Sequence, residues 1–183
     1  EVFLSDFSTI KPKFKSKLNS EAVEFEEGGH TMPRLETADL IVKSPGISDD
    51  LDVIQHLKEK HINIISEIEF ASRYTDANVV AITGSNGKTT VTNMVYHILH
   101  NAGLSVSMAG NIGFSFAEQV ARKKVHNYVL EVSSFQLDGI KNFKPHIAIL
   151  TSITPDHLDR YHHNFEEYIE AKFNITKWTC KGF

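Results

Sequence analysis

The sequence is poor in the features that mark secreted, membrane-spanning and nucleic-acid-binding proteins. Its 183 residues include a single cysteine, Cys180, so no disulfide can form within the chain, which agrees with a reducing cytoplasm. No apolar run reaches the roughly 20 residues of a membrane-spanning helix, and the sequence shows no basic-then-apolar signal-peptide pattern. The formal net charge of −4 gives no reason to expect nucleic acid or an anionic membrane as a partner. We therefore expect a cytoplasmic protein without membrane insertion.

Short apolar runs rich in β-branched residues alternate with helical patterns along the chain. Strands buried on both faces are predicted at Ala38–Val42, Ile62–Ile65, Val79–Thr83, Tyr128–Val132 and Ile147–Thr151. Helices are predicted at Asp49–Lys60, Glu67–Asp76, Thr90–Asn101, Phe114–Lys124 and Phe165–Trp178. Two apolar stripes are expected, one formed by Val91, Met94, Val95, Ile98 and Leu99 and the other by Phe165, Ile169 and Phe173. The alternation predicts an α/β fold with a mostly parallel sheet.

A domain boundary is expected where the polar stretch Glu67–Asp76 gives way to the next strand pattern. This places one domain at residues 1–76 and a second at residues 77–183. The sequence starts at Glu1 directly before a strand pattern, and its last residues carry no helix cap. We therefore expect a piece of a longer protein.

The strongest local motif is a predicted strand that runs through a glycine-containing turn into an amphipathic helix. Such a turn lets backbone N–H groups and a helix N-terminus face a phosphate chain. The turn consists of Gly84, Ser85, Asn86, Gly87, Lys88, Thr89 and Thr90. Lys88 would neutralise the β- and γ-phosphates, and the Thr89 hydroxyl would bind magnesium. Because Ile82 stands where the general P-loop pattern has glycine, the alternative is a strand–turn–helix junction that merely caps the helix.

A carboxylate, Glu131, lies at the end of the strand predicted at Tyr128–Val132. The carboxyl ends of parallel strands are where α/β proteins bind ligands, and Mg²⁺ prefers oxygen ligands. Beside a phosphate loop, Glu131 is therefore a candidate magnesium ligand. The alternative is a strand-end glutamate that is solvated or paired with a lysine.

These residues, together with further segments, resemble the Mur ligase family, and the resemblance covers nearly the whole chain. The phosphate loop looks like the family's shortened form, Thr83-Gly84-Ser85-Asn86-Gly87-Lys88-Thr89-Thr90. Further segments match in the same order: Ser44-Pro45-Gly46-Ile47, Gly110-Asn111-Ile112-Gly113, Glu131–Leu137, Thr154–Tyr161 and Tyr168–Phe173. The resemblance implies an incomplete Rossmann-like UDP-binding domain followed by part of a P-loop-type ATP-binding domain.

The family resemblance also implies an ATP-dependent ligase with two magnesium sites. One magnesium ion would be bound by Thr89 and Glu131, and the second by His157 and Lys172. Because an ammonium cannot bind a cation, the resemblance implies that Lys172 is carbamylated; Lys88, His157 and Lys172 would be the catalytic residues. From the residues alone, His157 reads as a surface loop histidine and Lys172 as a helix lysine whose stem covers apolar surface.

Substrate contacts are likewise implied by the resemblance. Ser44, Pro45 and Gly46 would contact the diphosphate of a UDP-sugar, although Pro and Gly favour a tight turn in any case. Asn111, Ser133 and Gln136 would line the same cleft. The segment Ser-Ser-Phe-Gln-Leu is most similar to the family member that joins D-glutamate to UDP-N-acetylmuramoyl-L-alanine, so these two molecules are the expected substrates of a monomeric enzyme.

Some departures from the family leave other interpretations open. Ser152 stands where the family usually has asparagine, and the family's third domain, which carries the amino-acid site, has no counterpart here. We therefore expect the 183-residue chain alone not to complete the ligase reaction. The alternatives are a sister ligase that adds another amino acid, a non-catalytic nucleotide-binding module and an unrelated P-loop ATPase.

Overall fold

The computed structural model describes residues 1–177, which divide into two compact units. The first unit consists of Glu1–Ile41 and Asp49–Asn63, and the second of Val42–Ser48 and the chain from Ile64 onward. Trp178, the expected end of the last helix, and Cys180 lie outside the described residues. Within residues 1–177, none of the helices combines the length and the apolar character that a membrane span requires.

The first unit is built around a pair of parallel strands joined by a helix. Strand β1 (Phe3–Asp6) pairs with β2 (Glu24–Glu27), and α1 (Pro12–Ser20) connects them. Pro12 stands in the first turn of α1, where a backbone N–H would have no helical partner. Two further helices follow in this unit, α2 (Met32–Leu35) and α3 (Asp52–Glu59).

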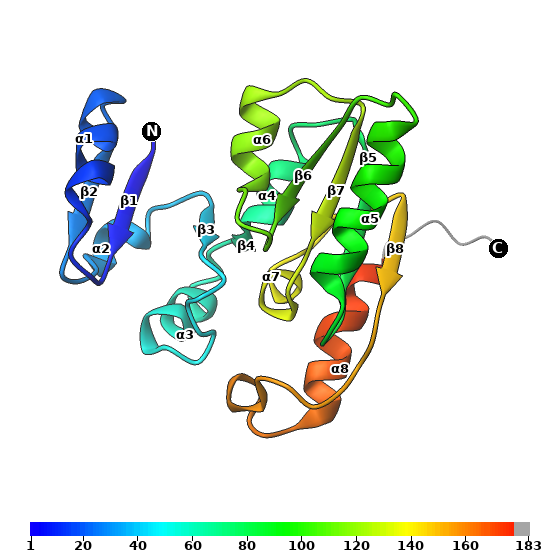
Figure 1. The fold of residues 1–183 in the computed structure, drawn as a ribbon. Helices are drawn as coiled ribbons and strands as arrows, with labels where there is room; N and C mark the ends of the chain where they lie inside the picture. The colour runs from blue at the N-terminus through cyan, green and yellow to red at the C-terminus, as the bar shows by residue number, and fades with distance from the viewer. Residues whose placement is uncertain (178–183) are drawn as a thin grey trace. The chain divides into compact units, whose positions relative to one another are not determined.

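The second unit contains a four-stranded parallel sheet in the order β6-β7-β5-β8 (Figure 1). Its strands are β5 (Asn78–Thr83), β6 (Val106–Gly110), β7 (Asn127–Glu131) and β8 (Ile147–Leu150). A separate two-stranded sheet joins β3 (Ile41–Lys43) and β4 (Ile64–Ser66). The helices of the unit are α4 (Glu67–Ser72), α5 (Lys88–Asn101), α6 (Phe116–Arg122), α7 (Ser134–Asp138) and α8 (Phe165–Phe173), with short 3₁₀ turns η1 (Leu158–Tyr161) and η2 (Asn174–Thr176).

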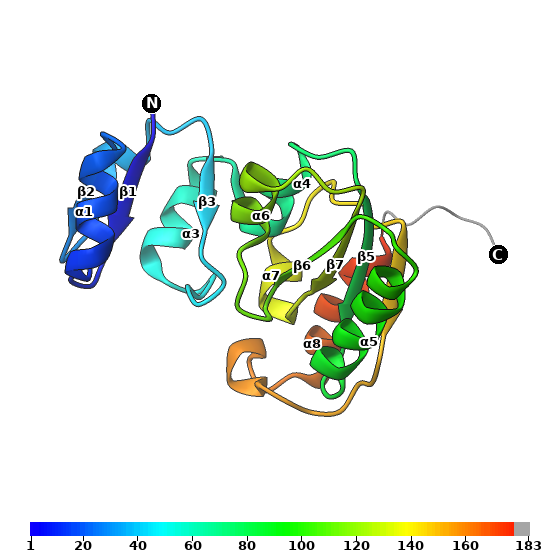
Figure 2. The ribbon, with the colours of Figure 1, turned by 45° about the horizontal axis from the view of Figure 1, so that its top comes forward.

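The main hydrophobic core lies between one face of this sheet and a layer of helices. Ile68 of α4, Phe116 of α6 and Leu137 of α7 pack there against the sheet residues Ala81 and Leu130. Helix α5 lies against the other face (Figures 1 and 2). Since all four strands are parallel, their carboxyl ends share one edge, where the loops after β5, β6, β7 and β8 meet.

The predicted α/β fold with a mostly parallel sheet is confirmed, but the expected burial of two elements is wrong. Strand β8 was expected to be buried on both faces, yet it is the outer strand of the sheet, and Ile147 is 55% exposed. In α5, Met94 and Ile98 of the expected apolar stripe are exposed, whereas Thr92 is buried. The helix therefore lies on the sheet along a stripe rotated away from the one that the apolar residues predict.

Helix α8 also presents a different face from the one that its apolar residues predict. Of the expected stripe, Phe173 is exposed, while the buried side chains are Tyr168, Ala171 and Lys172. A lysine on the buried face of a helix is uncommon unless a partner satisfies its ammonium. The alternative interpretation, in which Lys172 only covers apolar surface with its stem, is therefore wrong.

Candidate active site

The loop between β5 and α5 contains two glycines with positive φ. Gly84 has φ of +148° and Gly87 has φ of +81°, and Gly87 is the N-cap of α5. A Cβ on Gly84 would overlap the Thr151 hydroxyl, so the end of β8 lies directly against the loop. The backbone N–H of Ser85 donates to the Ser152 carbonyl at 2.8 Å, which fixes the loop on the neighbouring strand end.

Lys88 and Thr89 lie in the first turn of α5, and both side chains form hydrogen bonds beside the loop. The ammonium of Lys88 donates to the carbonyl oxygens of Gly84, at 2.9 Å, and Ser85, at 3.0 Å. It thus folds over the turn that its own backbone forms. The Thr89 hydroxyl donates to Glu131 Oε2 at 2.7 Å, which connects the helix start to the end of β7.

The Glu131 carboxylate, at the end of β7, accepts hydrogen bonds from two side chains, Thr89 of α5 and Asn111 of the loop after β6. Glu131 is 2% exposed, and the hydrogen bond from the Asn111 amide is 2.7 Å long. Gly110, with φ of +94°, allows this approach, because a Cβ there would overlap the Glu131 carbonyl oxygen. The hydroxyl of Thr89 and the carboxylate of Glu131 are the hard oxygen donors that Mg²⁺ prefers, so the donor set fits a magnesium ion.

Lys172 reaches the phosphate loop from helix α8. It is 2% exposed, and its ammonium donates to the Gly84 carbonyl at 2.9 Å while lying 4.5 Å from the centre of the Tyr168 ring. Burial and the nearby charge of Lys88, partly opposed by Asp156 and Asp138, together lower the pKa of Lys172 to about 8. Two lysine side chains therefore converge on one carbonyl oxygen.

His157 lies in the loop after β8, directly before the 3₁₀ turn η1. Its side chain is 59% exposed, its φ is +50°, and its Nε2 is 3.6 Å from Asp156 Oδ2. The ring meets Phe135 edge-on, with the ring centres 5.4 Å apart. Over the part of the chain that the structure describes, no three His, Cys, Asp or Glu side chains are grouped as a metal site.

Apart from Asn111, the residues expected to contact a UDP-sugar fall into two groups. Ser44, Pro45 and Gly46 form a turn closed by the Ile47 N–H, which donates to the Ser44 carbonyl at 3.1 Å. Ser133 and Gln136 instead form the capping box of α7, in which each side chain bonds the backbone of the other. Both groups stand at loops of the second unit.

Several side chains of this site were not singled out from the sequence. The Tyr168 hydroxyl is 2.8 Å from Ser85 Oγ, and it lies one helical turn before Lys172, a spacing that could have identified it. The Thr151 hydroxyl donates to the Asn86 carbonyl at 2.6 Å. Arg160 donates to the turn at Pro45 and Gly46, a contact across more than a hundred residues that no local pattern indicates.

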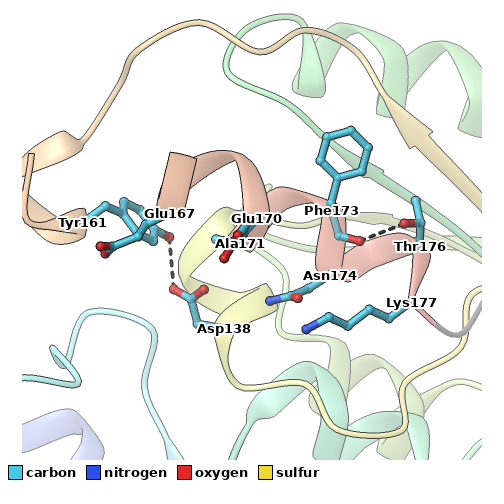
Figure 3. Close-up of a pocket in the computed structure, with 9 residues that line it drawn as sticks. All are labelled: Asp138, Tyr161, Glu167, Glu170, Ala171, Phe173, Asn174, Thr176 and Lys177. Carbon is cyan, nitrogen blue, oxygen red and sulfur yellow. Dashed lines mark hydrogen bonds between the residues drawn. The ribbon is translucent and has the colours of Figure 1, made fainter. Parts of the chain in front are cut away.

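A cavity of about 520 Å³ lies beside α8 (Figure 3). It is lined by Asp138, Tyr161, Glu167, Glu170, Ala171, Phe173, Asn174, Thr176 and Lys177. In it the Tyr161 hydroxyl donates to Asp138 at 3.0 Å. Neither the phosphate loop nor Glu131 lines this cavity, so it is distinct from the predicted site.

Comparison with protein-family models finds two matches along the chain. Residues 82–182 match the Mur ligase middle domain, which is more than half of the sequence. Residues 1–53 match the MurD N-terminal domain. The matched ranges contain the phosphate loop, Glu131, His157 and Lys172.

Curated relatives agree with the family models. UDP-N-acetylmuramoylalanine–D-glutamate ligase of Bacteroides fragilis is 55% identical over 97% of this chain, and that of Porphyromonas gingivalis is 56% identical over 96%. The chain spans about 40% of the length of these relatives.

Solved structures agree at the level of the fold. The UDP-N-acetylmuramate:L-alanyl-gamma-D-glutamyl-meso-diaminopimelate ligase from Neisseria meningitides is 17% identical, with a TM-score of 0.59 over 98% of this chain and 61% of that one. UDP-N-acetylmuramate-alanine ligase from Thermotoga maritima is 22% identical, with a TM-score of 0.52 over 97% of this chain and 41% of that one. The chain belongs to the Mur ligase family.

Proposed function

We propose that this chain supplies the nucleotide-binding part and much of the UDP-sugar-binding part of an ATP-dependent ligase that adds D-glutamate to UDP-N-acetylmuramoyl-L-alanine. The observation that carries the proposal is the joint placement of Thr89 and Glu131, 2.7 Å apart, beside a loop on which Lys88 and Lys172 also converge. The 55% identity to D-glutamate ligases supports the choice of amino acid. Residues 1–76 would form the UDP-sugar domain and residues 77–183 the ATP domain of a monomeric cytoplasmic enzyme.

The ATP phosphates would lie along residues 84–90. Backbone N–H groups at the start of α5 point out of the helix, so they can donate to phosphate oxygens without competing helical bonds. Lys88 would turn from the carbonyls of Gly84 and Ser85 to the β- and γ-phosphates. Thr89 and Glu131 would bind one magnesium ion, which would neutralise phosphate charge as it develops.

Lys172 is proposed to be carbamylated and, together with His157, to bind a second magnesium ion. Its neutral amine would attack CO₂, forming an N–C bond and releasing one proton, and the product is an anion with two oxygen ligands. Burial favours the neutral amine that this reaction needs, since it lowers the pKa of Lys172 to about 8. NMR with ¹³C-bicarbonate tests this directly: a carbamate carbonyl signal is expected that Lys172→Met abolishes.

The proposed reaction has two steps. The carboxylate of the UDP-sugar attacks the γ-phosphorus in line, forming an acyl phosphate and releasing ADP. The amine of D-glutamate then attacks the acyl carbon, phosphate leaves and an amide forms. The residues of this chain would act through positioning and charge neutralisation, which supply most of the catalysis in phosphoryl transfer.

Phosphate release tests the proposed function in the protein encoded by the complete coding region around this sequence. With ATP and UDP-N-acetylmuramoyl-L-alanine, D-glutamate should support release, whereas L-alanine, L-lysine and diaminopimelate should not. Release with another of these amino acids would show a sister ligase, and no release with any of them would show a non-catalytic nucleotide-binding protein.

Two variants test the role of the phosphate loop in the same assay. Lys88→Met should lower turnover by about a thousandfold while UDP-sugar binding persists. The matched control is Lys124→Met, because Lys124 is exposed after α6. Equal loss of turnover and UDP-sugar binding in Lys88→Met would contradict ATP binding at this loop. We further propose that the 183-residue chain alone gives no D-glutamate-dependent release.

A further inference from the structure

The guanidinium of Arg160 donates hydrogen bonds to three consecutive backbone carbonyls. Arg160 lies in η1, after β8, and donates to the carbonyl oxygens of Gly46 at 3.2 Å, Ile47 at 3.3 Å and Pro45 at 3.4 Å. The turn and Arg160 belong to the same compact unit. None of these carbonyls lies in a helix or strand, so Arg160 supplies donors that secondary structure does not.

The same guanidinium also lies on an aromatic ring that reaches His157. Its carbon is 4.5 Å from the centre of the Phe135 ring, and Phe135 in turn meets the His157 ring edge-on. Phe135 also stacks on Tyr161, with the ring centres 5.9 Å apart. One side chain thus connects the turn at Ser44–Ile47 to the aromatic group that borders His157.

A planar guanidinium suits this double contact better than an ammonium does. Its face can stack on a ring while the N–H groups at its edge donate to several acceptors in one plane. A lysine has a single nitrogen, so it cannot both spread over three carbonyls and cover Phe135. Lys43 also donates from its ammonium to the Ile47 carbonyl, at 2.7 Å.

We propose that Arg160 is a positioning residue that fixes the turn at Ser44–Ile47 relative to the loop carrying His157. This role rests on the proposed function: by fixing the turn, Arg160 would hold the UDP-sugar diphosphate at a set position relative to the γ-phosphate of ATP. Its loss would therefore weaken productive binding of the UDP-sugar and leave ATP binding nearly intact.

Hydrogen exchange in the 183-residue chain tests the structural half of this proposal without assuming any activity. Arg160→Gln should speed hydrogen exchange of the Ile47 amide, which closes the turn, by about tenfold. This is the loss of protection expected when hydrogen bonds from a charged donor are removed. Amides of β5 and β7 should keep wild-type protection, which shows that the fold is intact. The ring-proton shifts of His157 should move as well, because Phe135 loses its stacking partner.

Arg160→Lys and Arg122→Gln complete the exchange series. Arg160→Lys keeps the charge and should give an intermediate rate at Ile47. The control Arg122→Gln removes an exposed arginine paired with Glu118 at 3.1 Å and should leave Ile47 unchanged. Wild-type exchange at Ile47 in Arg160→Gln would overturn the proposal. If Arg160→Gln does not fold, an unchanged rate in Arg160→Lys would overturn it equally.

Steady-state kinetics of the enzyme from the complete coding region tests the functional half. Arg160→Gln should raise the KM for the UDP-sugar about tenfold or more, with the KM for ATP changed less than about twofold. Equal rises in both KM values would overturn the positioning role. A wild-type enzyme without ligase activity would instead contradict the proposed function, and the exchange result would still decide whether Arg160 fixes the turn.

Discussion

Burial of the Lys172 ammonium has a direct chemical consequence. The charged form loses hydration and lies near Lys88, so the neutral amine is favoured. Moving the pKa from 10.5 to about 8 raises the neutral fraction at pH 7 by roughly two orders of magnitude. Lys172 is thus far more nucleophilic toward CO₂ than an exposed lysine at the same pH.

The depressed pKa of Lys172 makes stability depend on pH in a defined direction. Between pH 8 and pH 10.5 the unfolded chain holds a proton at Lys172 that the folded chain has lost, so unfolding becomes less favourable as pH rises. Relative to Lys172→Met, wild type should gain about 3 kcal/mol across this window. Urea denaturation at a series of pH values, in bicarbonate-free buffer, measures the difference.

Lys124→Met serves as the control for this comparison, since Lys124 is exposed. Its unfolding free energy should follow that of wild type at every pH. Parallel pH profiles for wild type and Lys172→Met would show that the ammonium of Lys172 is not desolvated in the folded protein.

Gly84 is required by both its backbone conformation and its surroundings. Gly84→Ala would place a methyl group against Thr151 and strain a φ of +148°, so a loss of about 3 kcal/mol or more in unfolding free energy is expected. Gly113→Ala separates the two effects, because Gly113 also has positive φ but has open space around it; its cost should be about 1 kcal/mol. Equal losses in chemical denaturation would contradict the close contact with Thr151.

At the scale of elements, Glu69 connects α4 to the loop before β8. Its carboxylate is fully buried and accepts hydrogen bonds from the backbone N–H groups of Lys141, Asn142 and Phe143 and from the Arg73 side chain. Burial alone would raise the pKa of Glu69, but these hydrogen bonds together outweigh burial and lower it. Folded protein therefore binds the proton less well than unfolded chain does.

Glu69→Gln should destabilise the second unit, because an amide cannot accept the same set of N–H donors. We expect a loss of about 2 kcal/mol at pH 7. Since the folded pKa lies below the model-compound value of 4.5, the carboxylate's contribution is present above pH 4.5 and disappears as pH falls through the folded pKa. Acid unfolding followed by circular dichroism should show the loss shrinking below pH 4.5; a pH-independent loss would contradict this account.

Elements with strong apolar runs were predictable, whereas elements defined by long-range contacts were not. The prediction at Val79–Thr83 falls within one residue of β5, because a run of β-branched residues interrupted only by Ala81 ends at a glycine turn. Strand β6 was missed because Val106 is its only β-branched residue, while Ser107, Ala109 and Gly110 are small. Strand β2 was missed because Glu24, Glu26 and Glu27 leave only Phe25 as an apolar residue.

At the scale of the whole molecule, the sequence motifs predicted which residues belong near the phosphate loop but not every contact among them. Thr89 and Glu131, 42 residues apart, were expected to share a magnesium ion and are in contact, whereas Asn111 was expected to face substrate and instead donates to Glu131. Such pairings depend on the strand order β6-β7-β5, which brings the ends of β6 and β5 to either side of β7. Strand order is set by tertiary packing, and no local pattern encodes it.

Thr89 and Glu131 are proposed to bind the metal of a metal–nucleotide complex at the phosphate loop. Mn²⁺ can replace Mg²⁺ with a non-hydrolysable ATP analogue, and paramagnetic broadening of amide signals in the ¹⁵N-labelled 183-residue chain then locates the ion. The amides of Thr89, Asn111 and Glu131 should broaden first and only with the nucleotide present, and Glu131→Gln should abolish this while Glu118→Gln should not. Broadening centred instead on the acidic cavity at Asp138, Glu167 and Glu170, or unaltered by Glu131→Gln, would contradict the account.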